Sequence, residues 1–205
     1  MQATDDLIHG MAGTAGQGGD ATSLRRFMLI ALFLSFAAAT LLVWTLFGFR
    51  EDFAAMALGE PFLFKVSGAI VLAAGAYLLA RRATLPASGP LNAALLIPGM
   101  LPFALFALLD PSGGDNLSAA WCSADIGLLS LPALGLILAA MKKGAPTNPA
   151  KAGAVAGLLA GSLASGAHAL ACRNDHGLSV LMWYGLAIIL LSGLGSLIGR
   201  RVLRW

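Results

Sequence analysis

Charged side chains are scarce in this 205-residue chain, at 11% of all residues against 58% hydrophobic ones. A soluble globular protein carries roughly 25% charged residues. So few charges cannot cover a water-facing surface, and the mean hydropathy of +0.81 points the same way. The shortage excludes a soluble globular domain and predicts an integral membrane protein.

The chain also lacks the residue patterns of common catalytic and transport sites. It has no Walker motif, no Ser-His-Asp pattern placed for nucleophilic catalysis, and no paired carboxylates in the middle of an apolar segment. The centres of its apolar segments hold almost none of the polar residues that a proton or solute path requires. An enzyme is therefore not predicted. A small multi-span transporter or channel for a metal or apolar solute is kept as the alternative function.

Six apolar segments follow a polar, glycine-rich start. About 20 apolar residues cross a bilayer as a helix, and prolines inside such helices are tolerated because neighbouring groups satisfy the freed carbonyls. The sequence predicts a flexible segment over residues 1–24 and an all-α bundle of six transmembrane helices over residues 25–205. The predicted spans are 27–49, 62–80, 91–109, 124–141, 152–172 and 178–199.

Basic residues gather where the chain would return to one side of the membrane. By the positive-inside rule, this placement puts both termini in the cytoplasm. It also accounts for the net charge of +3 without a nucleic-acid partner. Ten of the thirteen Lys and Arg residues share that side: Arg25, Arg26, Arg81, Arg82, Lys142, Lys143, Lys151, Arg200, Arg201 and Arg204.

The chain has only two cysteines, Cys122 and Cys172, and the predicted topology puts both on the non-cytoplasmic side. In a bacterium that side is the periplasm, where disulfides form and persist. The absence of a Cys-x-x-Cys motif argues against a disulfide oxidoreductase. A structural disulfide, a redox or metal sensor and two unrelated thiols all stay open, because sequence alone does not test bridge geometry.

Two histidines stand close to Cys172 in the sequence. His168, Cys172 and His176 are spaced four apart, so on a continuing helix they would share one face. With Cys122 they would offer two sulfurs and two nitrogens to a soft metal. The spacing is not a recognised zinc motif, and His176 falls past the predicted helix end. A buried, hydrogen-bonded His168 and a solvated His176 is the plainer interpretation, and no resident cofactor is expected beyond transient binding of a heavy metal.

Two further features lie within the spans. Lys65 and Asp125 intrude near the same edge of the membrane, where they would snorkel to the interface or pair with each other. In the fifth span, Gly153, Gly157 and Gly161 lie on one helical face. Such a small-residue face lets another helix approach closely in lipid, from this chain or from a second copy.

Several short motifs occur in order along nearly the full chain. Together with the topology they resemble the six-span negative regulators of extracytoplasmic-function sigma factors, of the negative-regulator-of-sigma-F type found in proteobacteria. The motifs are Asp5-Asp6-Leu7-Ile8, Trp121-Cys122, Ser130-Leu131-Pro132-Ala133, Lys143-Gly144-Ala145-Pro146, Cys172-Arg173-Asn174-Asp175, Trp183-Tyr184 and the basic residues 199–205.

The resemblance implies a function that composition does not supply. Proteins of this family hold a sigma factor at the inner membrane and release it under metal or oxidative stress. Carried over to this chain, the sigma factor would be bound by the N-terminal tail through Asp5, Asp6, Leu7 and Ile8. Cys122 and Cys172 would form the periplasmic sensor.

Overall fold

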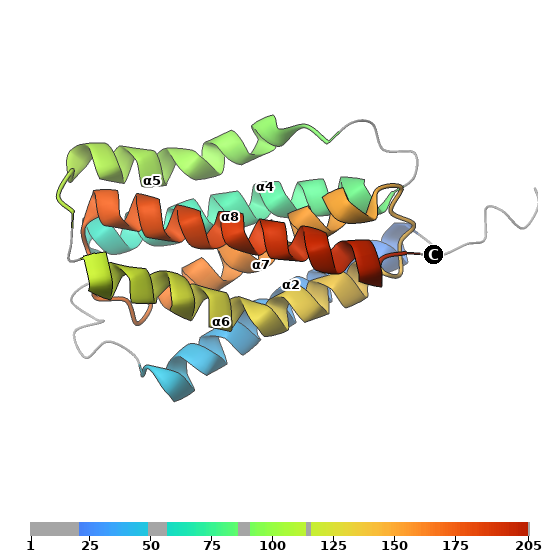
Figure 1. The fold of residues 1–205 in the computed structure, drawn as a ribbon, viewed down its shortest axis with the longest axis horizontal. Helices are drawn as coiled ribbons and strands as arrows, with labels where there is room; N and C mark the ends of the chain where they lie inside the picture. The colour runs from blue at the N-terminus through green and yellow to red at the C-terminus, as the bar shows by residue number, and fades with distance from the viewer. Residues whose placement is uncertain (1–20, 49–56, 86–90, 114–115, 205) are drawn as a thin grey trace, which may run out of the picture.

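The computed structural model describes residues 21–48, 57–85, 91–113 and 116–204, and these residues form an all-α bundle with no strand among them (Figure 1). The predicted all-α class is confirmed. The elements are α2 (Ala21–Leu46), α4 (Glu60–Thr84), the 3-10 helix η1 (Ala93–Leu96), α5 (Ile97–Leu109), α6 (Asn116–Met141), α7 (Pro149–His168) and α8 (Gly177–Val202).

Four of these helices are long and apolar enough to cross a membrane, where the sequence predicted six spans. The four segments are Ser23–Leu46, Glu60–Thr84, Ala120–Met141 and Gly177–Val202. The predicted third span is divided between η1 and the 13-residue α5, and a helix of that length reaches only about 20 Å. The predicted fifth span, α7, is 20 residues long but is built largely from alanine, glycine and serine, so its apolar character is weaker.

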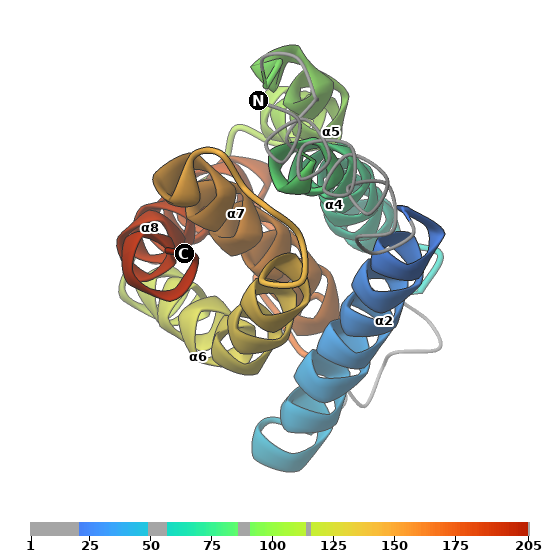
Figure 2. The same cartoon turned by 90° about the vertical axis from the view of Figure 1, so that its right-hand side faces the viewer.

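Helix α7 occupies the centre of the bundle. It packs against α8, α4, α6 and α2, which surround it when the bundle is viewed end on (Figure 2). Most of its residues are buried accordingly. Asn148 starts the helix by accepting a hydrogen bond from the backbone N–H of Lys151 at 3.0 Å, and Pro149 occupies the first helical turn, where a missing N–H costs nothing.

The α7–α8 contact is made backbone to backbone. A Cβ atom added to Gly153 or Gly157 would collide with the main chain of α8, and one added to Gly195 or Gly199 would collide with that of α7. Gly161 faces Leu191 and Ile188 at ordinary or slightly tight contact distances. The small-residue face is thus occupied by a helix of the same chain.

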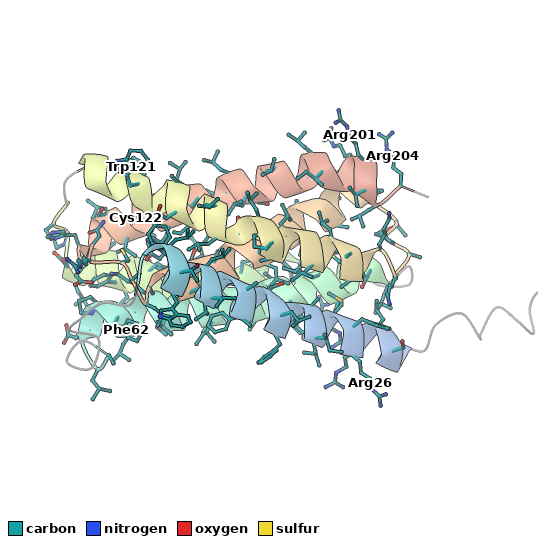
Figure 3. All side chains as sticks on the ribbon, turned by 90° about the horizontal axis from the view of Figure 1, so that it is seen from below. Arg26, Phe62, Trp121, Cys122, Arg201 and Arg204 are labelled. Atoms are coloured by element: carbon teal, nitrogen blue, oxygen red, sulfur yellow. The ribbon has the colours of Figure 1, made fainter. Side chains whose placement is uncertain are left out.

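The two ends of the bundle differ in chemistry. Arg26, Arg201 and Arg204 lie at one end, which we call the basic end, and Cys122 lies at the other, which we call the thiol end (Figure 3). The helix α2 begins and α8 ends at the basic end (Figure 1). Between the two ends the outward faces of the helices carry large apolar side chains, such as Phe33 and Ile189, which are 70% and 69% exposed.

Candidate functional site

The two cysteines, distant in sequence, meet at the thiol end. Cys122 lies in the second turn of α6, and Cys172 lies four residues beyond the end of α7. Their sulfur atoms are 3.7 Å apart, and both residues are buried. A disulfide holds its sulfurs at about 2.05 Å, so the structure contains two thiols in contact and no bond between them.

The position of Cys172 follows from how α7 ends. The predicted fifth span ran to residue 172, but the helix stops at His168. The chain then turns tightly, because the backbone N–H groups of Ala171 and Cys172 both donate to the His168 carbonyl oxygen at 3.0 Å. The bond from Cys172 spans four residues, as in an α-helix, so Cys172 lies about one turn beyond His168 and on the same side of the chain.

His168 is the third member of this group. The two sulfur atoms and a ring nitrogen of His168 all lie within 4.8 Å of one another. His168 is 3% exposed, and neither of its ring nitrogens has a hydrogen-bond partner among the described residues. His168 is thus buried, as expected, but among the described residues the only group that could serve as its expected hydrogen-bond partner is the Cys172 thiol. We call Cys122, His168 and Cys172 the thiol cluster.

Aromatic rings enclose the thiol cluster. The ring centroid of His168 lies 6.0 Å from that of Tyr184 and 6.3 Å from that of Phe47. The hydroxyl of Tyr184 is buried and, like the His168 nitrogens, has no hydrogen-bond partner among the described residues. Leaving a buried polar atom unpaired costs about 1–3 kcal/mol. Three such atoms around two sulfurs make this the least satisfied polar region of the described structure.

The thiol cluster has the donor chemistry of a soft-metal site. Two thiolates and one imidazole suit zinc, copper(I) and similar ions. In a tetrahedral site with Zn–S bonds of about 2.3 Å, two thiolate ligands lie about 3.8 Å apart, close to the 3.7 Å seen between the two sulfur atoms here. The unpaired nitrogens of His168 agree with this use.

His176, the fourth predicted ligand, lies elsewhere. It is the residue that precedes α8, and its Nδ1 is 2.9 Å from the hydroxyl of Ser112. Its side chain is 51% exposed. The two-sulfur, two-nitrogen set is not assembled, because the helix that would have placed His176 above Cys172 ends at His168.

A buried ion pair holds the segment that follows Cys172. The ammonium of Lys65, on α4, lies 2.8 Å from a carboxylate oxygen of Asp175. Lys65 is 1% exposed and the Asp175 side chain is 26% exposed. Lys65 therefore neither snorkels to the interface nor pairs with Asp125, as the sequence had suggested; it ties α4 to the chain three residues beyond Cys172.

Asp110 joins α5 to the start of α8 on the same end of the bundle. Its carboxylate accepts a hydrogen bond from the backbone N–H of Gly177 at 3.1 Å, and its main-chain oxygen accepts one from Leu178. Ser112 donates to it through both its hydroxyl and its backbone N–H. The hydroxyl of Ser112, followed by the N–H of Gly177, lowers the pKa of Asp110 below its usual value.

The sequence model of a family described as "negative regulator of sigma F" matches residues 16–205 of the chain. The chain belongs to this family. A member of the negative regulator of sigma F family from Azospira oryzae, a probable anti-sigma-F factor NrsF, is 34% identical over 212 residues, which cover 98% of this chain and 99% of that protein. The anti-sigma-F factor NrsF of Caulobacter vibrioides is 31% identical over 215 residues, with the same coverage. No solved structure matches the chain.

Membership in the negative regulator of sigma F family makes the chain one of a group of regulators. The tail residues expected to bind a sigma factor, Asp5, Asp6, Leu7 and Ile8, lie outside the residues that the structure describes. Tyr184, Asp110 and the partner of Lys65 escaped the sequence analysis. Tyr184 and Asp175 stand in the Trp183-Tyr184 and Cys172-x-x-Asp175 motifs, but a motif does not give contacts, and no motif contains Asp110.

Proposed function

We propose that this protein is an integral membrane anti-sigma factor, which holds an extracytoplasmic-function sigma factor and releases it when the thiol cluster binds a soft metal or is oxidised. The observation that carries the proposal is the meeting of Cys122, His168 and Cys172 within 4.8 Å at the end of the bundle opposite the arginines. The family of this chain and its anti-sigma-F relatives support the sigma-factor partner.

The proposed setting is the bacterial inner membrane, crossed six times, with both termini in the cytoplasm. The exposed apolar side chains between the two ends suit lipid better than water. The basic end suits the cytoplasmic face by the positive-inside rule. The alanine-rich α7 needs little apolarity of its own to cross, because the other helices cover it. The shorter α5 would cross together with η1.

The proposed contact with the sigma factor is the N-terminal segment, through Asp5, Asp6, Leu7 and Ile8. An acidic pair followed by an aliphatic pair can fold onto a partner that offers basic and apolar surface. The segment precedes α2 in the chain and is separated from it by residues 9–20.

The chemistry at the thiol cluster takes one of two forms. A soft metal ion would displace the protons of both thiols and accept three ligands from Cys122, His168 and Cys172. Alternatively, a peroxide would take two electrons from the two thiols, form a disulfide and leave as two molecules of water. The second route would draw the sulfurs from 3.7 Å to about 2.05 Å. Each route favours an arrangement of α6 against α7 that the thiol form does not require.

Helix α6 would carry this change to the basic end. It holds Cys122 near its first turn, and just beyond its last residue the ammonium of Lys143 lies 3.3 Å from the ring centroid of Phe27, at the start of α2. A cation over an aromatic ring at this distance is attracted to it. A shift of α6 would therefore pull on the beginning of the helix that leads to the proposed sigma-binding segment.

The test is release of the sigma factor from the purified protein. Full-length protein in detergent is bound to an extracytoplasmic-function sigma factor of its own organism, and then exposed to cadmium, copper(I) or hydrogen peroxide. Wild-type protein is expected to release its partner, whereas Cys122→Ser/Cys172→Ser binds it and does not release it. A Ser112→Ala control, at the thiol end but outside the thiol cluster, releases it normally. Normal release from the double serine variant contradicts the sensor, and absence of binding by wild type contradicts the partner.

A transporter or channel is less well supported by the same residues. Buried serines in the helices use their hydroxyls on nearby carbonyls: Ser130 donates to Gly127 at 2.7 Å, and Ser162 to Leu158 at 2.8 Å. These hydroxyls are engaged with their own helices, and neither bonds to another helix. Vesicles that contain the protein are expected to take up no cadmium or copper above protein-free vesicles.

A further inference from the structure

A large apolar cavity opens on the side of the bundle between α2 and α4, above α7. Its volume is about 440 Å³, and its walls include Leu32, Phe36, Ile70, Ala73 and Leu163. This volume lies in the range of about 300–1,000 Å³ that is typical of sites for small molecules. Because α2 packs mainly on α6 and α7, its side chains leave space at the seam with α4.

Nearer the basic end, the same seam carries positive charge. A small hollow between α2 and α4 is lined by Arg25 from one helix and Arg81 from the other. Guanidinium groups bind phosphate through charge-assisted hydrogen bonds, often two at a time. The seam therefore offers two cations to an anionic group at the level where a helix leaves the membrane.

Tyr77 lies between the two arginines and the deeper part of the cavity. It stands one helical turn before Arg81 on α4 and lines the cavity. Its hydroxyl is buried and has no hydrogen-bond partner among the described residues. Four residues rise about 6 Å along the helix axis, so Tyr77 lies deeper below the basic end than Arg81. The tyrosine thus supplies a hydrogen-bond donor at that depth.

We propose that the seam between α2 and α4 binds one anionic phospholipid. Its phosphate lies between Arg25 and Arg81, an ester oxygen accepts a hydrogen bond from Tyr77, and an acyl chain fills the cavity. From Arg81 to Ile70 the helix rises about 16 Å, roughly half of the 30 Å hydrocarbon thickness of a bilayer. This assignment rests on the proposed membrane location.

Along the seam, the two arginines come first, Tyr77 follows, and the apolar cavity lies deepest. This order favours a phospholipid over other occupants. A lipid without net charge, such as phosphatidylcholine, would use the cavity but neutralise the arginines less well, because its own cationic headgroup lies beside its phosphate. A second copy of the chain would have to offer an anionic group at the arginines and an apolar segment at the cavity. A phospholipid has both parts at the required separation and is present wherever a membrane protein is.

The experiment compares two lipids that have the same acyl chains and different headgroups. Full-length protein is purified in detergent, incubated with phosphatidylglycerol or phosphatidylcholine, and analysed by native mass spectrometry. One phosphatidylglycerol is expected to bind at concentrations where phosphatidylcholine does not. The double variant Arg25→Gln/Arg81→Gln is expected to lose about 25-fold in affinity, from about fivefold for each cation. Arg200→Gln/Arg201→Gln, which removes two cations outside the seam, retains wild-type affinity.

A second pair of variants tests the cavity. Ala74 lines it, so Ala74→Phe is expected to abolish binding, while Leu78→Phe on the same helix, outside the cavity, leaves it unchanged. Tyr77→Phe is expected to weaken binding about threefold, the effect of one hydrogen bond. Equal binding of both lipids, or unchanged binding by the double arginine variant, overturns the proposal. A dimer that Ala74→Phe dissociates would instead assign the cavity to a second copy. Protein that fractionates away from membranes would refute the membrane location itself.

Discussion

The two halves of the bundle are built in different ways. Toward the basic end, the buried cluster contains alanine, leucine, isoleucine and methionine and no aromatic residue, with Met28, Met141 and Leu203 among its members. Toward the thiol end, the buried cluster includes Phe103, Tyr184 and both cysteines. The first half is closed by backbone contact between α7 and α8 at their glycines. Of the four buried polar atoms without partners among the described residues, three lie in the second half, and only the hydroxyl of Tyr77 packs beside the first.

This difference separates a rigid half from a responsive one. Close backbone contact leaves little freedom, because helices that touch at glycine cannot shift without losing the contact or colliding. Unpaired buried atoms raise the free energy of the state that contains them. A ligand or a new bond that satisfies them can therefore favour another arrangement, as a sensor requires. Four changes, from the largest expected effect to the smallest, test this contrast.

The largest effect is expected from crowding the glycine contact. A Cβ at Gly195 would collide with the main chain of α7, so Gly195→Leu should lower the free energy of unfolding by more than about 3 kcal/mol. The measurement is the yield of monodisperse protein in detergent and its unfolding midpoint. Gly193→Leu, two residues earlier on α8 with open space at its Cβ, serves as the control. Equal behaviour of the two variants would refute the rigid half.

The second effect concerns the ion pair beside the thiol cluster. Lys65→Met removes the ammonium that lies 2.8 Å from the partly buried carboxylate of Asp175. The loss of this contact should cost about 2 kcal/mol, less than for a fully buried pair because water reaches Asp175. Chemical denaturation in micelles measures it. The exchange Lys65→Asp/Asp175→Lys should recover part of the loss, and Lys151→Met, on an exposed residue at the basic end, should have no effect. If Lys65→Met and Lys151→Met lowered the free energy of unfolding by similar amounts, the ion pair would have no special role in stability.

The third change should stabilise the protein and weaken its chemistry. His168→Leu removes two buried nitrogens without partners, so the free energy of unfolding should rise by about 1 kcal/mol. The same variant should bind cadmium at least about tenfold more weakly, because a ligand is lost. Isothermal titration and thermal unfolding measure the two effects. His176→Leu, outside the thiol cluster, should leave cadmium binding unchanged, and a loss of stability in His168→Leu would mean that the ring is satisfied in the folded protein.

Part of this arrangement could be predicted from the sequence. Spacing alone predicted the small face of α7, because Gly153 and Gly157 share a helical face whatever they touch. It also predicted that both cysteines lie at one end. It did not predict the end of α7 at His168, since nothing in residues 169–172 is a strong helix breaker. That end decides which histidine joins Cys172, and hence the composition of the thiol cluster.

The sequence also did not predict which polar side chains pair over long distances in the chain. Lys65 and Asp175 are separated by 109 intervening residues, and their pairing follows from how α4 packs beside the turn after α7. In the sequence, Asp125 and Asp175 were both candidate ion-pair partners for Lys65, because both lie near the same edge of the membrane. Only the packing of the helices shows which of them Lys65 contacts. The hydroxyls of Tyr77 and Tyr184 were equally hidden, because a tyrosine in an apolar helix does not show whether its oxygen finds a partner.

The smallest effect is expected from a substitution of Asp110, whose carboxylate has hydrogen-bond partners at the thiol end. The hydrogen bonds from Ser112 and Gly177 lower the pKa of Asp110 below the model-peptide value of 3.8. A carboxyl whose pKa is depressed on folding stabilises the protein above the unfolded pKa, and this contribution is lost as the pH falls through the folded value. Asp110→Asn should therefore unfold at a slightly lower temperature than wild type at pH 7, and the difference should shrink as the pH falls below 3.8. Because Asp110 is partly exposed, water weakens its bonds. A difference that does not change with pH would mean that shape, and not charge, makes this connection between α5 and α8.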